Sequence, residues 1–148
     1  MTVTFFGHRD TPLTIYPLLK QTIVDLIERH GANRFYIGSN GNFDSLSQKV
    51  LRELQKEYPN IQYLIVLSHI PANQRISDDT DYSNTLIPEG LENVPPRFAI
   101  DHRNRWLLAH CDCVIAYVKS SIGGASKFMS LAEKRGKLII NIAKTNPI

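Results

Sequence analysis

The hydrophobic positions of this chain form two kinds of pattern that alternate along it. Short runs of strand length, rich in apolar and β-branched residues, occupy 2–6, 34–37, 61–67, 113–118 and 138–142. Between them, apolar residues recur three or four positions apart, the spacing of a helix face, in 15–30, 43–58, 96–111 and 125–136. Alternating strands and helices are typical of a parallel sheet with crossover helices. We therefore predict an α/β fold: a single-domain, doubly wound, Rossmann-like parallel sheet of about five strands in the order 3-2-1-4-5, with helices on both faces.

Three local features refine this prediction. Thr14 is a candidate cap for the first helix, because its side chain can accept a backbone hydrogen bond there. The run 61–67 is apolar except for Gln62, which is typical of a strand covered on both faces, so we expect a central or well-covered strand there. Residues 68–96 show no sustained periodicity and are rich in proline and acids, so we expect a long loop or lid within the one domain, 1–148.

The composition limits the classes of function. The formal net charge of +3 is spread along the 148 residues without a basic run, which argues against a nucleic-acid arm or a membrane patch and favours small anionic ligands. No apolar run has transmembrane length and the N-terminus lacks a signal-peptide pattern, so we expect a cytoplasmic protein. Cys111 and Cys113 lack the spacing of a zinc or redox pair, and we interpret them as reduced core cysteines with no metal.

The candidate chemistry lies at the carboxyl ends of the predicted strands, where ligands bind in doubly wound sheets. Loops "GHRD" (7–10), "GSNGNFD" (38–44) and "SSIGGAS" (120–126) contain glycines, which let backbone N–H groups and a helix N-terminus approach an anion. The alternative is that these glycines only form turns. The candidate ligand-binding residues are Gly7, His8, Arg9, Gly38, Ser39, Asn40, Gly41, Asp44, Arg103, Asn104, Ser121, Gly123, Gly124, Ala125 and Ser126.

Known nucleotide fingerprints are absent from these loops. The chain contains neither G-x-G-x-x-G after its first strand nor G-x-x-x-x-G-K-[ST] anywhere. This argues against a standard NAD dehydrogenase and against a P-loop NTPase.

Several candidate side chains have two possible roles. Arg103 falls on the apolar stripe of its helix, and a buried arginine needs a partner, which is either Asp44 or a ligand phosphate; we favour the ligand. Asn104 could orient a base or ribose. Arg9 could bind a phosphate or pair with Asp10, and His8 could transfer a proton or only pack.

Four stretches in register resemble the SLOG superfamily, Rossmann-like proteins that include the SMF/DprA and LOG groups. They are "TFFGHRD", "FYIGSNGNFD", "PPRFAIDHRNRWL" and "VIAYVKSSIGGASKF", and they span nearly the whole chain. The likeness is closest to small bacterial single-domain members of unknown function. It implies a nucleotide pocket with Gly123 and Gly124 facing the phosphate, Gly38 and Gly41 in the first glycine-rich loop, and Arg103 at the arginine of an R-K pair.

The chain departs from the pattern of the LOG enzymes, which are phosphoribohydrolases with a glutamate in P-G-G-x-G-T-x-x-E. Ser130 stands where that glutamate would be, Ser126 and Lys127 replace the G-T, Ile122 replaces the proline, and Asn104 replaces the lysine of the R-K pair. These departures argue against the hydrolase activity that the resemblance would otherwise imply.

The sequence therefore predicts a cytoplasmic protein that binds a nucleotide or nucleotide-derived molecule as a sensor or carrier, with no cofactor beyond that ligand. The first alternative is an N-glycosidic hydrolase with a different acid, for which Asp10, Asp44, Glu89 and Glu92 are candidates and His8 is a further catalytic candidate. The second is a protein-interaction module with a vestigial pocket. Binding of single-stranded DNA needs a basic groove with aromatics, which the sequence does not show. We expect a homodimer.

Overall fold

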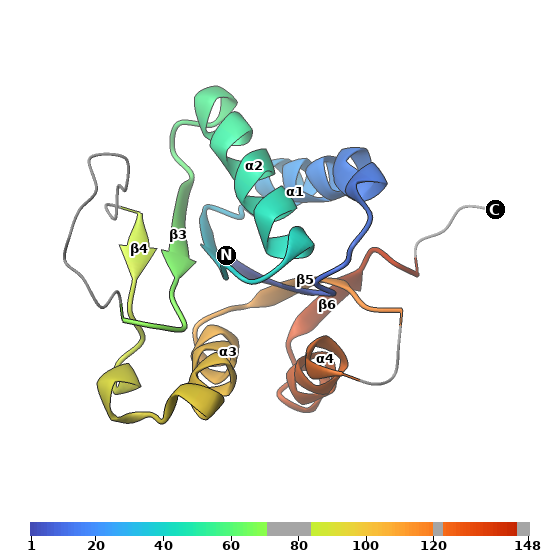
Figure 1. Cartoon of the computed structure of the whole chain (residues 1–148). Helices are drawn as coiled ribbons and strands as arrows, with labels where there is room; N and C mark the ends of the chain where they lie inside the picture. Colours follow the sequence, from blue (N-terminus) through green and yellow to red (C-terminus); the bar gives the residue numbers. More distant parts are fainter. Residues whose placement is uncertain (71–83, 120–122, 145–148) are drawn as a thin grey trace.

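The sheet of this protein has six parallel strands in the order β4-β3-β2-β1-β5-β6 (Figure 1). The structure is a computed structural model, which describes residues 1–70, 84–119 and 123–144. The strands are β1 (Thr2–Gly7), β2 (Arg34–Ile37), β3 (Gln62–Val66), β4 (Thr85–Leu86), β5 (Cys113–Tyr117) and β6 (Leu138–Asn141). The predicted strand order 3-2-1-4-5 is confirmed, with β4 added at one edge.

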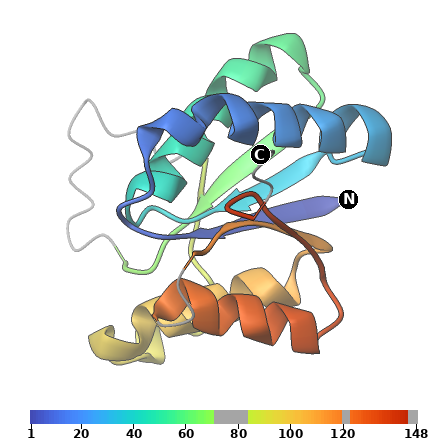
Figure 2. The same cartoon turned by 90° about the vertical axis from the view of Figure 1, so that its right-hand side faces the viewer.

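Two layers of helix cover the sheet, one on each face (Figure 2). The helices α1 (Tyr16–His30) and α2 (Asn42–Glu57) pack on one face, and α3 (Ala99–Ala109) and α4 (Gly124–Lys134) pack on the other. Short 3-10 turns are η1 (Leu13–Ile15), η2 (Leu91–Asn93) and η3 (Pro96–Phe98). Each face has its own hydrophobic cluster, so the doubly wound, Rossmann-like architecture is confirmed.

The ends of α1 show which local signals were informative. Gly31, which directly follows the predicted helical range 15–30, ends the helix in the left-handed conformation with φ 69°. The prediction that Thr14 caps the start was wrong: the N-cap is Ile15, and it makes no side-chain cap hydrogen bond. The reason is the 3-10 turn η1, which contains Thr14 and leads directly into α1.

Strand β3 is less covered than its sequence predicted. Gln62 is exposed, and Tyr63, Leu64 and Ile65 are only half-buried. The outer neighbour of β3 is β4, which has two residues and therefore shields little of it. The expectation of a central or well-covered strand was therefore wrong, because an apolar run does not distinguish a central strand from one near an edge.

Part of the long segment 68–96 forms regular structure. Residues 71–83 lie outside the described part of the chain, so the expectation of a lid there is not addressed. Within 84–96 the chain forms β4, the turn η2 and the start of η3, which corrects the expectation of a segment without regular structure. These elements are too short to give a periodic sequence signal.

The cysteines lie in the core, as predicted. Cys111 and Cys113 are free and buried, and burial raises the pKa of each thiol to about 11. Within the described residues, no cluster of His, Cys, Asp and Glu could hold a metal ion. The helices of the same ranges include none with the length and apolar character needed to cross a bilayer.

Candidate functional site

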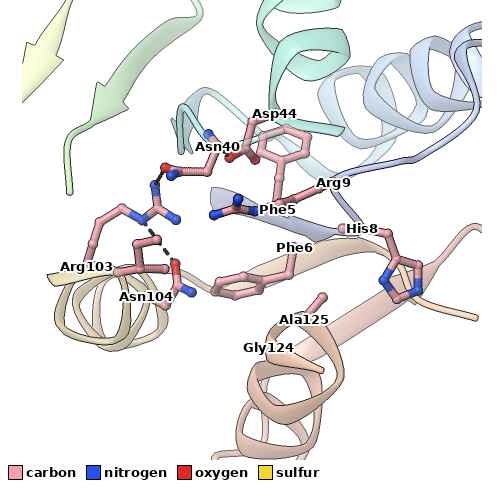
Figure 3. Close-up of a pocket in the computed structure, with 12 residues that line it drawn as sticks. Phe5, Phe6, His8, Arg9, Asn40, Asp44, Arg103, Asn104, Gly124 and Ala125 are labelled. Carbon is pink, nitrogen blue, oxygen red and sulfur yellow. Dashed lines mark hydrogen bonds between the residues drawn. The ribbon is translucent and has the colours of Figure 1, made fainter. Parts of the chain in front are cut away.

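A cavity of about 410 Å³ opens at the carboxyl ends of β1 and β2, between α2 on one face and α3 and α4 on the other (Figure 3). Its volume falls within the range of small-molecule sites. The lining residues are Phe5, Phe6, Gly7, His8, Arg9, Asn40, Asp44, Ile100, Arg103, Asn104, Gly124 and Ala125.

Most of the predicted ligand-binding residues meet in this cavity. Those that line it are Gly7, His8, Arg9, Asn40, Asp44, Arg103, Asn104, Gly124 and Ala125. Gly38, Ser39, Gly41, Gly123 and Ser126 belong to the same loops and helix start but do not line it. Ser121 lies outside the described residues. Residues more than 60 positions apart in the sequence, such as Asn40 and Arg103, therefore meet at the carboxyl ends of the strands, as predicted.

Arg103 is buried in the wall of the cavity, with 4% of its surface exposed. Its Nη1 donates to Oδ1 of Asn40 at 2.9 Å, and its Nε donates to Oδ1 of Asn104 at 3.0 Å. Both partners are neutral amides, and among the described residues no carboxylate lies within 4.0 Å of the guanidinium. The two asparagines therefore orient the guanidinium without neutralising its charge.

The charge of Arg103 is unfavourable where it lies. Burial lowers the pKa of Arg103, the carboxylate of Asp44 acts in the opposite direction, and the positive charge of Arg9 lowers it further. A bound anion would offset both the burial and the repulsion between the two arginines.

Arg9 is the second positive group of the cavity, and it comes from the loop after β1. Its side chain is exposed and extends toward Arg103 (Figure 3). Within the described ranges, its guanidinium has neither a hydrogen bond nor an ion pair, so the expected alternative, a local pair with Asp10, does not form. Two arginines thus converge on one cavity, and the described part of the chain provides no acidic partner in contact with them.

Gly41 fixes the position of the Arg9 loop. Asn42, which begins α2, donates its N–H to the carbonyl of Arg9 at 2.9 Å. Gly41 has φ 96°, and a Cβ there would lie 2.7 Å from the Cα of Arg9. Glycine is therefore required both for the turn and for the close approach of the two loops.

Asp44 places a carboxylate in the same cavity. It is 7% exposed, and its Oδ2 accepts the backbone N–H of Asn40 at 2.9 Å. Burial raises the pKa of Asp44 to about 6, although the hydrogen bond from Asn40 and the charge of Arg103 both act to lower it. Asp44 therefore orders the loop after β2 and also provides an acid that titrates near neutral pH.

Gly38 makes room for the Arg103 and Asp44 side chains. A Cβ on Gly38 would lie 2.5 Å from Nη1 of Arg103 and 2.6 Å from Oδ2 of Asp44. Packing alone therefore explains why residue 38 is a glycine, whether or not an anion binds nearby. Gly7 has a similar one, because a Cβ there would lie 2.2 Å from the ring of Phe43.

Replacing Gly38 with alanine is expected to lower the free energy of unfolding by about 1 to 3 kcal/mol, because the methyl group would displace Arg103 or Asp44. Urea denaturation measures this change. Gly124→Ala is the matched control: a Cβ there meets nothing within 4 Å, and alanine favours a helix, so stability should not fall. An equal loss in both variants would contradict this account of Gly38.

His8 joins the ends of two neighbouring strands. The N–H of Lys119, which follows β5, donates to Nε2 of His8 at 2.9 Å, and the ring lies edge-on to Tyr117 with centroids 6.3 Å apart. Nε2 is thus an acceptor, which places the proton of the neutral ring on Nδ1. These contacts give His8 a positioning role for Tyr117 and Lys119 at the end of β5.

The start of α4 faces the cavity opposite Asp44 (Figure 3). Gly123 is the N-cap with φ 112°, and no side chain caps the helix. A Cβ on Gly123 or Gly124 would meet no atom within 4 Å, in contrast to Gly7, Gly38 and Gly41. These two glycines leave the first backbone N–H groups of α4 accessible, and they carry the positive end of the helix dipole.

Three lining residues were not among the sequence candidates: Phe5, Phe6 and Ile100. In the sequence, Phe5 and Phe6 have the pattern of ordinary core residues of the first strand. Ile100 did carry a usable signal, because it precedes Arg103 by three residues and therefore shares its side of the helix.

Comparison with known proteins gives a structural match. No protein-family model matches the chain, and no curated protein matches it either. The X-ray structure of DNA processing protein A (DprA) from Streptococcus pneumoniae superposes with a TM-score of 0.67 over 93% of this chain, at 17% sequence identity. The chain has a DprA-like fold. It covers 48% of the DprA chain, so it spans about half of that protein's length. The match confirms the Rossmann-like fold.

Proposed function

We propose that this protein binds a phosphate-bearing nucleotide or nucleotide derivative in the cavity between β1, β2 and α4, and acts as a sensor or carrier. One observation carries the proposal: Arg9 and Arg103 converge on the cavity, and no acidic side chain of residues 1–70, 84–119 or 123–144 is in contact with either guanidinium. A phosphate there would receive charge-assisted hydrogen bonds from both guanidinium groups. The open N-terminus of α4 would face the same anion.

The similarity to LOG proteins supports the same ligand. By this similarity, Gly123 and Gly124 would face the phosphate. They are also the glycines of the cavity loops at which an added Cβ would meet no atom within 4 Å. Asn40 and Asn104, which hold Arg103, also line the cavity and could bind ribose hydroxyls with their amide groups. A homodimer is a further part of the proposal, to be checked by light scattering on the eluting protein.

Isothermal titration calorimetry with nucleoside mono- and diphosphates, ADP-ribose and NAD tests the proposal. We expect binding, and we expect Arg9→Met to weaken it about tenfold or more, because a hydrogen bond to a charged group contributes about 1.5 to 3 kcal/mol. Arg52→Met is the matched control, since Arg52 is an exposed arginine of α2 that does not line the cavity.

Two outcomes would count against the proposal. One is the absence of heat and of a thermal shift with every compound of the panel. The other is equal affinity of the Arg9 and Arg52 variants, which would show that any binding occurs elsewhere on the molecule.

An N-glycosidic hydrolase is a second candidate, and Asp44 is the observation that favours it. Of the four acids considered from sequence, Asp10, Glu89 and Glu92 do not line this cavity, whereas Asp44 does and has a pKa raised to about 6. Such a carboxyl can act as a general acid or base near neutral pH. Ser130, at the place of the LOG glutamate, is exposed on α4. Free base released from a nucleoside monophosphate, and lost in Asp44→Asn, would favour this candidate.

DNA is a further candidate ligand, because the protein with the similar fold is named for DNA processing. The described basic residues of this chain are spread over many elements, and only two arginines line the cavity. Nonspecific binding of single strands relies on a continuous basic groove with stacking aromatics. We therefore propose a small nucleotide as the ligand in place of a strand.

A further inference from the structure

A second cavity, of about 440 Å³, adjoins the first at the same edge of the sheet. Its walls come from the residues that follow β3, from the η2 region and from the first turn of α3. In Figure 1 the yellow segment that leads into α3 lies below the ends of β3 and β4. Ile100 lines both cavities, so they lie on either side of this one side chain.

The two cavities differ in chemistry. The first carries two arginines and a carboxylate, whereas the walls of the second are mostly aliphatic, with Leu91, Val94 and Ala99 among them. Ile70 and Ile100 at this cavity are 46% and 38% exposed, although both are large apolar residues. A flat apolar group in the second cavity would remove part of this surface from water, which is favourable.

Ser68 gives the apolar cavity a hydroxyl group. The residue is 7% exposed and lines the cavity, and no other described residue forms a hydrogen bond with its hydroxyl. Since no fully buried side-chain oxygen or nitrogen of the described residues lacks a hydrogen bond, this hydroxyl keeps some exposure and can bond to a ligand in the cavity. His69 and Glu92 add an imidazole and a carboxylate to the lining. An apolar slot with a few hydrogen-bonding groups suits a heteroaromatic ring with polar edges.

The spacing of the strands fits a single ligand that reaches both cavities. The first cavity is centred on the end of β1, the second begins at the end of β3, and β2 lies between them. Two strand spacings amount to about 10 Å. A phosphate held at β1 and a ring held at β3 would leave room for a ribose between them, beside Ile100.

We propose that the second cavity is the nucleobase subsite, and that it holds the purine or pyrimidine of the nucleotide whose phosphate lies between Arg9 and Arg103. This inference rests on the proposed function, since it assigns the other end of the same ligand. Ile100 then separates the phosphate end from the base end.

Calorimetry with three probes tests the inference: AMP, ribose 5-phosphate and pyrophosphate. For the wild type we expect AMP to bind about tenfold or more tightly than ribose 5-phosphate, because only AMP fills the second cavity. Val94→Trp and Ala99→Phe add bulk to that cavity and should reduce AMP affinity to that of ribose 5-phosphate. Leu13→Trp, at an exposed position outside both cavities, is the control and should bind AMP as the wild type does.

The outcomes separate this inference from the proposed function. Equal affinity of the wild type for AMP and ribose 5-phosphate, or unchanged AMP binding in both cavity variants, would overturn the base subsite and leave the phosphate site standing. No binding of any of the three probes would overturn both. Circular dichroism of each variant shows whether a loss of AMP binding reflects a loss of fold, and unchanged binding of ribose 5-phosphate by the variants would support the inference directly.

Discussion

The stability advantage of Asp44→Asn over the wild type is expected to grow by about 2 to 3 kcal/mol between pH 4 and pH 7.5. Burial raises the pKa of Asp44 from 3.8 to about 6. In this window the folded protein keeps a proton that the unfolded chain releases, so the free energy of unfolding of the wild type falls as pH rises. Below about pH 4 both states are protonated, and above about pH 7 both are ionised, so the change is confined to the interval between them.

Urea denaturation of the two proteins at several pH values measures this difference. The asparagine can still accept the N–H of Asn40 through its amide oxygen, so the variant removes the ionisation and retains the hydrogen bond. Asp10→Asn is the control, because Asp10 is an exposed carboxylate on the facing loop. A gap between wild type and Asp44→Asn that stays constant with pH, or the same pH dependence in Asp10→Asn, would show that the burial of Asp44 is not the cause.

An ionisable group that destabilises the fold at neutral pH calls for an explanation. Asp44 has no ion pair in the described structure, and an asparagine would satisfy the same backbone N–H. Buried groups with shifted pKa values gather at functional sites, because binding and proton transfer use the charge that folding alone would not retain. The position of Asp44 in the arginine cavity agrees with this interpretation.

The sequence predicted the framework because a few strong signals determine it. Short runs rich in apolar residues predicted five of the strands, and their predicted order was that of a Rossmann-like sheet. Short elements escaped prediction: β4 has two residues and η2 has three, and neither is long enough to show a period. Thr14 was expected as a cap because local sequence does not show that a 3-10 turn precedes α1.

The location of the candidate site could be predicted from the sequence, but the contacts between its side chains could not. Parallel strands end at one edge of the sheet, so the loops that follow them could be brought together from sequence alone. The partners of Arg103 could not: its hydrogen bond to Asn40 joins residues 63 positions apart, and it depends on how α3 packs against the loop after β2. The role of Gly38 has the same origin, since the atoms it accommodates come partly from α3.

Arg103→Met is expected to weaken nucleotide binding about 100-fold or more, the largest effect of any single change in the cavity. The guanidinium is held by Asn40 and Asn104 through Nη1 and Nε, which leaves Nη2 for a ligand without further ordering. Arg103→Lys should recover only part of the affinity, because a lysine presents a point charge and cannot bind both asparagines and the phosphate in one plane.

Calorimetry with the tightest nucleotide of the panel measures the effect, and the control lies on the same helix. Arg105 is two residues from Arg103 but is exposed, and it pairs with Asp101 at 2.8 Å, an interaction worth less than about 1 kcal/mol. Arg105→Met should therefore bind as the wild type does. If both methionine variants bind equally well while remaining folded by circular dichroism, Arg103 is a structural arginine satisfied by its two asparagines, and the phosphate site must be sought elsewhere. If only Arg103→Met loses binding, the unneutralised charge in the wall of the cavity is the group that recognises the anion.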